Sequence, residues 1–298
     1  MSKSKRKPTK NRKMAIEKEL WLETIKEGMV PNTSFLSESV NLDEHVEYNV
    51  LHLAEAGVEP EVFIDNDVWP IPVAKREDIP LELPLHTFDS ENTLLQNVEK
   101  KEASYNKMES IVRGHRRSLI KKISSQAAYN WCPSQNSEFN PVLVSDGAVN
   151  KSGVKRVSFE DFLVMEARFR ALEVDTDTLV AVLNPVHLAD LRTEDLKLFK
   201  EVLSSGKLFN FKLHTFSMLP YFDITTGKKK AFGAAVTEND TQATLCYCKD
   251  EVGLARGTVD VFARYNDPEM RGDIIGFQQR AMALPLRNKY IGAIYSGK

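Results

Sequence analysis

The sequence predicts an α+β protein in which an N-terminal arm and a proline-rich ribbon precede one long helix and an α/β body. Three observations support this order. Five of the 13 prolines fall within residues 60–90, residues 91–130 contain no proline, and apolar strands alternate with helical patterns from residue 131 onward. The chain has 298 residues, 42% of them hydrophobic and 28% charged, as in folded proteins of one or two domains. No apolar run is long enough to span a bilayer.

The arm differs in charge from the rest of the chain. The formal net charge is -2, yet the first 13 residues carry seven basic side chains and no acidic one, so the remaining residues are clearly acidic. A basic arm of this kind is either a solvated tail or a segment that contacts polyanions without reading their sequence. Its cations are Lys3, Lys5, Arg6, Lys7, Lys10, Arg12 and Lys13.

Residues 60–90 are predicted to form an extended ribbon. Ile79, Leu81, Leu83 and Leu85 alternate with other residues, which is the period of a β-strand, and the turn to the preceding strand is expected at 75–78. Prolines restrict such strands to an edge or an isolated hairpin. A ribbon of this length is marginal alone in water, so it needs either the rest of the chain or another copy.

Residues 91–130 are predicted to form one long helix. Apolar side chains recur at helical spacing, and forty helical residues would extend roughly 60 Å. Gly114 is the expected position of a bend. Between residues 100 and 122 there are eight basic residues against two acidic ones, so one face is strongly basic. That face is either solvated or in contact with phosphates or an acidic neighbour.

The body shows local signals for several elements. Ser158 and Asp161 resemble a capping box, and Asn184 followed by Pro185 is typical of a helix start, here for a helix expected to reach about Leu203. Residues 178–183 are continuously apolar, which predicts a central strand. Further strands are expected at 208–216, 230–236 and 243–249, an ambiguous segment at 251–265, and a closing hairpin around Pro285.

Motifs of the common enzyme classes are missing, so we predict no catalytic residues and no cofactor. His187 and Asp190 share a helix face, but a solvated or core histidine explains this pair better than a general base. Arg271-Gly272-Asp273 is interpreted as a turn before a strand.

The three cysteines do not indicate a disulfide framework. Cys246 and Cys248 would lie on one face of a strand, where a metal could bridge them. No further cysteine or histidine lies near them in the sequence, so we predict no metal site.

The order of these parts resembles the major capsid protein of tailed bacteriophages, with its Hong Kong 97-type fold. Three stretches carry the resemblance: residues 62–119 (VFIDNDVWP…HRRSL) to the passage from extended loop to spine helix, TLVAVLNPVHLADLR to a strand–helix unit, and GDIIGFQQRAMALPLRNKYIGAIY to the closing strands. The resemblance implies a basic arm at 1–57, an extended loop (E-loop) at 58–90, a peripheral domain with its spine helix at 91–157, an axial domain at 158–270, and closing peripheral strands at 271–298.

The resemblance also implies a function. The chain would assemble into hexamers and pentamers of an icosahedral head shell that encloses double-stranded DNA. It would be located in the virion and would not contact a membrane. It would be made in the host cytoplasm, with scaffold, portal and decoration proteins as further partners. The side chains expected at contacts between copies are Trp69, Lys75, Arg76, Glu77, Asp78, Leu81, Leu83, Arg113, Arg116 and Arg117. Acidic residues near the ribbon would face a neighbour's basic helix: Glu77, Asp78, Glu82, Asp89 and Glu91 against Lys101, Arg113, Arg116 and Arg117.

Other classes stay open. An encapsulin-like compartment would share the shell fold but would need an internal groove for cargo. A DNA- or RNA-binding protein could use the basic arm and helix, although no base-reading motif is present. An α/β enzyme would need a nucleophile–base pair that the sequence does not show.

Overall fold

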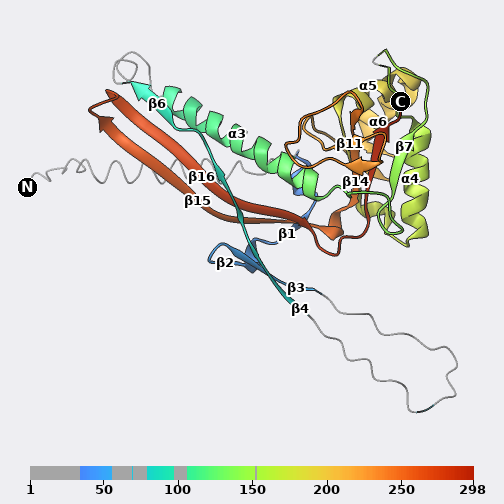
Figure 1. Ribbon diagram of the computed structural model, residues 1–298, viewed down its shortest axis with the longest axis horizontal. Helices are drawn as coiled ribbons and strands as arrows, with labels where there is room; N and C mark the ends of the chain where they lie inside the picture. The colour runs from blue at the N-terminus through green and yellow to red at the C-terminus, as the bar shows by residue number, and fades with distance from the viewer. Residues whose placement is uncertain (1–33, 56–68, 70–78, 97–105, 152) are drawn as a thin grey trace, which may run out of the picture.

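The computed structural model describes residues 34–55, 69, 79–96, 106–151 and 153–298, and its long axis follows a large antiparallel hairpin (Figure 1). The hairpin consists of β15 (Val252–Asp267) and β16 (Gly272–Pro285). The short strand β1 (Val40–Asn41) pairs with β15. On the other side, β16 pairs with β5 (His86–Asp89) and β6 (Thr93–Gln96). These five strands form the first sheet.

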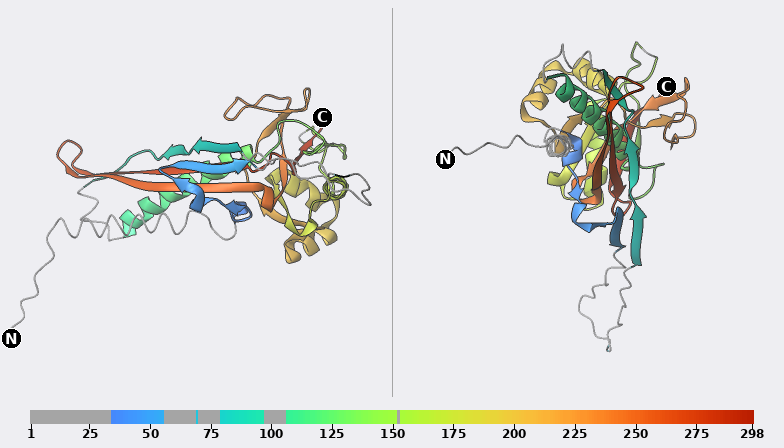
Figure 2. Two further views of the ribbon diagram at one scale, coloured as in Figure 1. Left: turned by 90° about the horizontal axis from the view of Figure 1, so that it is seen from below. Right: turned by 90° about the vertical axis from the view of Figure 1, so that its left-hand side faces the viewer.

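The helix α3 (Asn106–Asn130) packs along one face of this sheet, which Figure 2 shows nearly edge-on. Its 25 residues extend about 37 Å. Val112, Leu119 and Ile123 are buried at helical spacing, and they share a core cluster with Phe277 of β16. The helix therefore stays on the sheet because a single apolar stripe faces the strands.

The prediction of one helix over 91–130 was wrong at its start. Residues 93–96 form β6, which pairs with residues 272–275 of β16. Leu94 and Leu95 fit helical spacing, but a short apolar run fits a strand equally well when a partner strand is available. That partner is far away in the sequence.

The second sheet forms the body, with strand order β7-β17-β14-β8-β10-β9. All five residues of the inner strand β8 (Leu179–Leu183) are buried, which confirms the predicted central strand. The helices α4 (Phe159–Ala171), α5 (Pro185–Glu194) and α6 (Leu196–Ser205) belong to the body. The other strands are β7 (Val142–Ser145), β9 (Lys207–Leu208), β10 (Phe211–Thr215), β14 (Thr244–Cys248) and β17 (Ile291–Ser296).

The predicted helix signals in the body are confirmed. Ser158 and Asp161 form a reciprocal capping box, and Asn184 caps α5 with Pro185 in its first turn. The predicted helix to Leu203 is interrupted, however, because Asp195 ends α5 and accepts hydrogen bonds from the first backbone N–H groups of α6. Gly206, in the left-handed region, ends α6.

The strands after residue 207 differ in part from those predicted. Residues 230–236 form no strand, whereas β10 and β14 lie within the predicted strands at 208–216 and 243–249. The ambiguous segment at 251–265 is the long strand β15. The closing hairpin around Pro285 was wrong, because β16 and β17 belong to different sheets. Arg271, at φ 53°, is the last residue of a turn, and Gly272 and Asp273 begin β16, so the predicted turn into a strand is confirmed.

Two small three-stranded sheets complete the described fold. One contains β11 (Tyr221–Asp223), β12 (Lys228–Lys229) and β13 (Asp240–Gln242). The other contains β2 (Val46–Glu47), β3 (Val50–Glu55) and β4 (Ile79–Pro84), and its last two strands extend away from the body in Figure 1. Short 3-10 helices lie at Phe35–Ser37, Asp43–His45, Thr176–Thr178 and Lys249–Glu251.

The ribbon has a different first strand from the one predicted. β4 confirms the strand at 79–84, but it pairs with residues 50–55 rather than with the residues just before 75–78. The predicted pairing across a turn at 75–78 was therefore wrong for β4. The predicted turn residues themselves lie outside the described residues. Within the described ranges, no helix has the length and apolarity required to cross a membrane.

Candidate assembly surfaces

The ribbon and α3 lie on opposite faces of the first sheet. Leu254 and Ala283 are register partners, and both belong to the core cluster under α3. The next pair, Ala255 and Met282, belongs to a separate cluster with Leu51 of β3. Because successive strand residues point to opposite faces, α3 covers one face and the base of the ribbon covers the other.

The base of the ribbon is fixed by a small apolar cluster. Leu51 is completely buried, Leu42 and Leu85 are nearly so, and Leu53 and Leu83 pack against them. Leu83 is the register partner of Leu51. The ribbon thus leaves the body from an anchored base.

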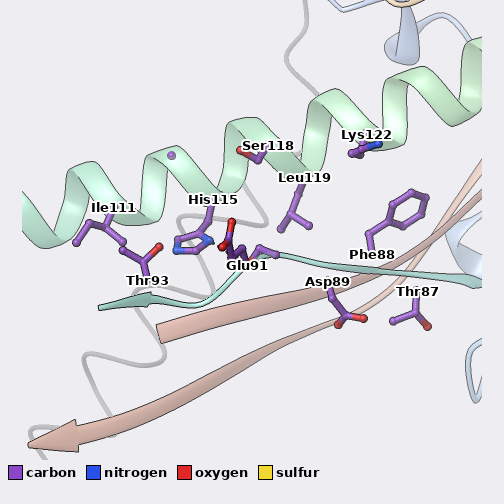
Figure 3. Close-up of a pocket in the computed structure, with 12 residues that line it drawn as sticks. Thr87, Phe88, Asp89, Glu91, Thr93, Ile111, His115, Ser118, Leu119 and Lys122 are labelled. Atoms are coloured by element: carbon purple, nitrogen blue, oxygen red, sulfur yellow. Dashed lines mark hydrogen bonds between the residues drawn. The ribbon is translucent and has the colours of Figure 1, made fainter. Parts of the chain in front are cut away.

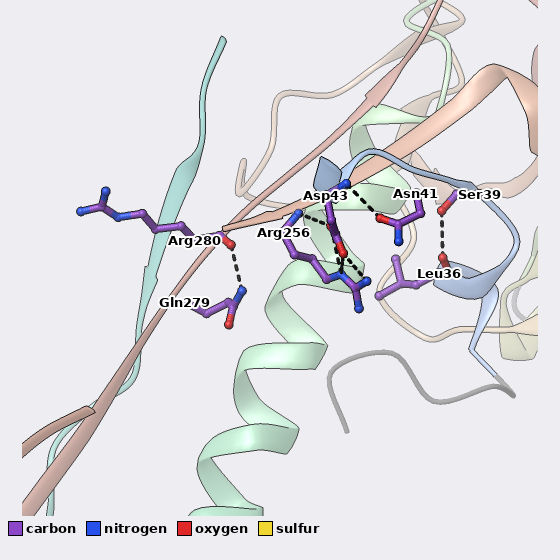
Figure 4. Close-up of polar contacts among 7 residues, drawn as sticks. All are labelled: Leu36, Ser39, Asn41, Asp43, Arg256, Gln279 and Arg280. Carbon is purple, nitrogen blue, oxygen red and sulfur yellow. Dashed lines mark hydrogen bonds and ion pairs between the residues drawn. The ribbon is translucent and has the colours of Figure 1, made fainter. Parts of the chain in front are cut away.

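A charged pair holds the segment before the ribbon against β15 (Figure 4). Asp43 Oδ1 accepts the backbone N–H of Arg256 at 2.8 Å, and Asp43 Oδ2 accepts Arg256 Nε at 2.9 Å and also Nη2. Both side chains are about two-thirds buried, at 29% and 32% exposed. The contact lies where the register between β15 and β16 shifts, after Arg256, so it secures an irregular point of the hairpin. The sequence carries no signal for this pair, whose members are 213 residues apart.

A groove of about 680 Å³ separates α3 from β5 and β6 (Figure 3). His115 points into it from α3, and its Nδ1 lies 3.0 Å from Ser90 Oγ. Ser90 Oγ accepts the backbone N–H of Phe277 at 2.9 Å, so its own proton is available for Nδ1. Burial lowers the pKa of His115, which favours the neutral ring. The exposed carboxylates Asp89 and Glu91 line the same groove.

The residues expected at contacts between copies are distributed widely. Trp69 is 74% exposed. Leu81 lies in β4 opposite Leu53. The predicted loop residues Lys75, Arg76, Glu77 and Asp78, as well as Lys101 and the seven cations of the arm, lie outside the described residues.

The predicted contact residues of α3 differ in exposure. Arg113 and Arg117 lie on its solvent side and are exposed, whereas Arg116 is half-buried. Arg113 forms an ion pair with Glu109 at 3.2 Å, one helical turn earlier. Glu82 is exposed on β4, and its carboxylate lies 3.6 Å from His52 of β3. The predicted charge pairs between copies stay a prediction.

His187 is a core histidine. Its Nδ1 lies 2.8 Å from Thr244 Oγ1 and its Nε2 lies 3.1 Å from Ser296 Oγ, so α5 is joined to two strands of the body. Burial lowers the pKa of His187 to about 3, and the ring is neutral at ordinary pH. Asp190 is also buried, and burial raises the pKa of its carboxyl. These contacts confirm that His187 is a core histidine, as predicted, and they do not place it as a general base exposed to substrate.

The cysteines are buried thiols. Cys132, Cys246 and Cys248 are all at most 6% exposed, and burial raises the pKa of Cys132 to about 12. Burial likewise raises the pKa of Cys246. Such thiols are poor nucleophiles. Within the described ranges, no group of three or more histidine, cysteine or acidic side chains has the arrangement of a metal site.

Comparisons with known proteins identify the fold. No family model matches the chain, and no curated protein matches its sequence. The capsid of Ralstonia phage GP4 is similar in structure, with a TM-score of 0.64 at 9% identity, over 89% of this chain and 88% of that chain. A chain of Mycobacterium phage Che8 gives a TM-score of 0.62 at 13% identity, over 89% and 92%.

A virus-like particle from Pyrococcus furiosus gives a TM-score of 0.56 at 14% identity, over 93% of this chain and 99% of that chain. Each of these likenesses covers about nine-tenths of this chain. The chain therefore has the Hong Kong 97-type fold of tailed-phage capsid proteins.

Proposed function

We propose that this chain is a major capsid protein, which assembles into hexamers and pentamers of an icosahedral head shell around double-stranded phage DNA. The observation that supports it most is likeness to phage capsid chains over nearly nine-tenths of both chains. The histidine that the sequence offered as a candidate base, His187, is a buried structural residue.

The ribbon is the part that we assign to contacts between copies. Its base is anchored on its own body, while the strands β3 and β4 extend away from that body (Figure 1). Copies in a ring make head-to-tail contacts, in which a projecting segment of one covers a different surface of the next. We place Trp69, Lys75, Arg76, Glu77, Asp78 and Leu81 at this contact. Leu83, which the sequence also suggested for it, packs in the base cluster of its own chain.

Electron microscopy and sedimentation of the purified full chain test the proposal. We expect closed shells or capsomers. A variant in which a short Gly-Ser linker replaces residues 58–76 should keep the melting temperature of the body but lose assembly. The matched control is a substitution of exposed residues on α6, Lys197→Gln with Lys200→Gln, which should still assemble. A wild-type chain that stays monomeric at high concentration would contradict the proposal.

The basic arm is proposed to contact the packaged DNA or a scaffold inside the shell, and portal and decoration proteins are proposed further partners. Deletion of residues 2–13 should change genome content or assembly fidelity. Particles of normal size and DNA content from that deletion would reject a role for the arm.

A second candidate is an encapsulin-like compartment, which the likeness to the Pyrococcus furiosus particle favours. The contents of purified shells separate the two functions. Nuclease-protected DNA supports the phage capsid, whereas a co-purifying cargo protein without DNA supports the compartment. A stable monomer that binds duplex DNA would support the nucleic-acid-binding alternative.

A further inference from the structure

The first buried residues that the structure describes lie on the face of the first sheet that α3 covers. These residues, Phe35 and Leu36, belong to the core cluster under α3. The Phe35 ring packs edge-on against Trp131, just after the end of α3, with 5.9 Å between ring centroids. Its carbonyl accepts a hydrogen bond from the Tyr247 hydroxyl at 3.1 Å. Phe35 and Leu36 are therefore fixed on the α3 face.

The solvent side of α3 carries a row of cations. Arg113, Arg117 and Lys121 follow each other at intervals of four residues, so they lie on one stripe of the helix over about 12 Å. All three side chains are exposed, and Lys122 beside them is exposed too. Glu109 at the start of the row is the one acidic residue of α3. The row is thus a strongly cationic feature of the face on which the first described residues lie.

The base of the ribbon lies on the face of the first sheet opposite α3. Copies related by rotation about an axis normal to a shell all turn the same face outward. In such a shell the row on α3 is therefore directed toward one side, and the base of every copy's ribbon lies toward the other.

We propose that Arg113, Arg117 and Lys121 face the interior of the shell and contact phosphates of the enclosed duplex DNA. The inference rests on the proposed function, which supplies the polyanion. The contacts are independent of base sequence, because the row offers charge from an exposed helix side and no element that enters a groove of DNA. The row adds to the arm a second, rigid site for DNA.

Binding of the unassembled full chain to a short fluorescent DNA duplex tests the proposal, with anisotropy measured over a series of salt concentrations. The test variant combines Arg113→Gln, Arg117→Gln and Lys121→Gln. Each lost phosphate contact lowers the slope of log affinity against log salt by about 0.9, so we expect a decrease of about 2 to 3. The control, Lys197→Gln, Lys200→Gln and Lys207→Gln, removes the same charge from exposed positions elsewhere and should leave the slope unchanged.

A charge-preserving variant, Arg113→Lys with Arg117→Lys and Lys121→Arg, should restore the wild-type slope, and unchanged circular dichroism verifies the fold of each variant. Equal slopes in the test variant and the control would overturn the inference, as would wild-type protein without measurable DNA binding. Lost assembly with an unchanged slope would overturn it as well and would assign the row to protein contacts. Shell formation by the wild type is observed separately by microscopy, so failure of the proposed function is recognised independently.

Discussion

The substitution Leu51→Ala should release the base of the ribbon without unfolding the body. Leu51 is completely buried in a small cluster, and the other buried residues of this cluster are Leu42, Leu85 and Ala255. Removal of its two methyl groups and one further carbon costs about 2.5 kcal/mol in transfer free energy, and the residual cavity brings the cost to about 3 kcal/mol. Because this cluster is separate from the two larger ones, the loss falls on β3 and β4.

Hydrogen exchange of the unassembled chain measures this effect. A local cost of about 3 kcal/mol should raise the exchange of amides in residues 50–55 and 79–84 roughly a hundredfold, with little change in β8. Leu191→Ala is the matched control, since Leu191 is equally buried but belongs to the body. It should lower the melting temperature and leave the ribbon relatively unaffected. Uniform acceleration over all strands in Leu51→Ala, or none in the ribbon, would refute the reasoning.

Three further substitutions test other features. Gly114→Ala should raise the free energy of unfolding by about 0.5–1 kcal/mol, since a Cβ there meets no atom within 4 Å. Gly147→Ala should lower the free energy of unfolding, because a Cβ there meets the backbone carbonyl of Arg156. Thermal melts of the two variants test this difference. Because the pKa of His187 is lowered to about 3 in the folded protein, the unfolded chain takes up this proton at higher pH than the folded chain does. The free energy of unfolding should therefore fall by up to about 1.4 kcal/mol per pH unit as the pH drops from about 6.5 toward 3. His187→Gln should reduce this pH dependence in denaturant titrations, and an unchanged pH dependence would contradict the argument. A double-mutant cycle of Asp43→Asn and Arg256→Gln should give a coupling of about 1 kcal/mol, and a value near zero would show that the pair is not an anchor.

Local signals were enough to predict the parts of the body. The capping box at Ser158, the cap at Asn184 and the buried strand after Thr178 all act within a few residues, so a single sequence contains them. The break at Asp195 was missed because Asp195 both ends one helix and caps the next, and the apolar pattern continues across it.

Pairings between distant segments could not be predicted. β6 looked helical because its partner, the start of β16, is remote in the sequence. β4 was given the wrong partner because a nearby turn was the simplest closure, whereas residues 50–55 present the matching apolar face. The groove around His115 and the Asp43–Arg256 pair depend on the same remote pairings, so no local pattern indicated them.

The ambiguity of residues 251–265 has a physical cause that links the sequence to the two faces. Residues 252–255 are buried on both sides of the sheet, under α3 and under the ribbon base, and they read as a continuous apolar run. From Thr258 onward buried and exposed residues alternate, because only the α3 face is still covered. The change of pattern near Arg256 therefore marks the point along β15 where the ribbon leaves the sheet. In the proposed shell these two faces of the sheet would have different tasks, because the ribbon would contact neighbouring copies and the basic side of α3 would contact DNA.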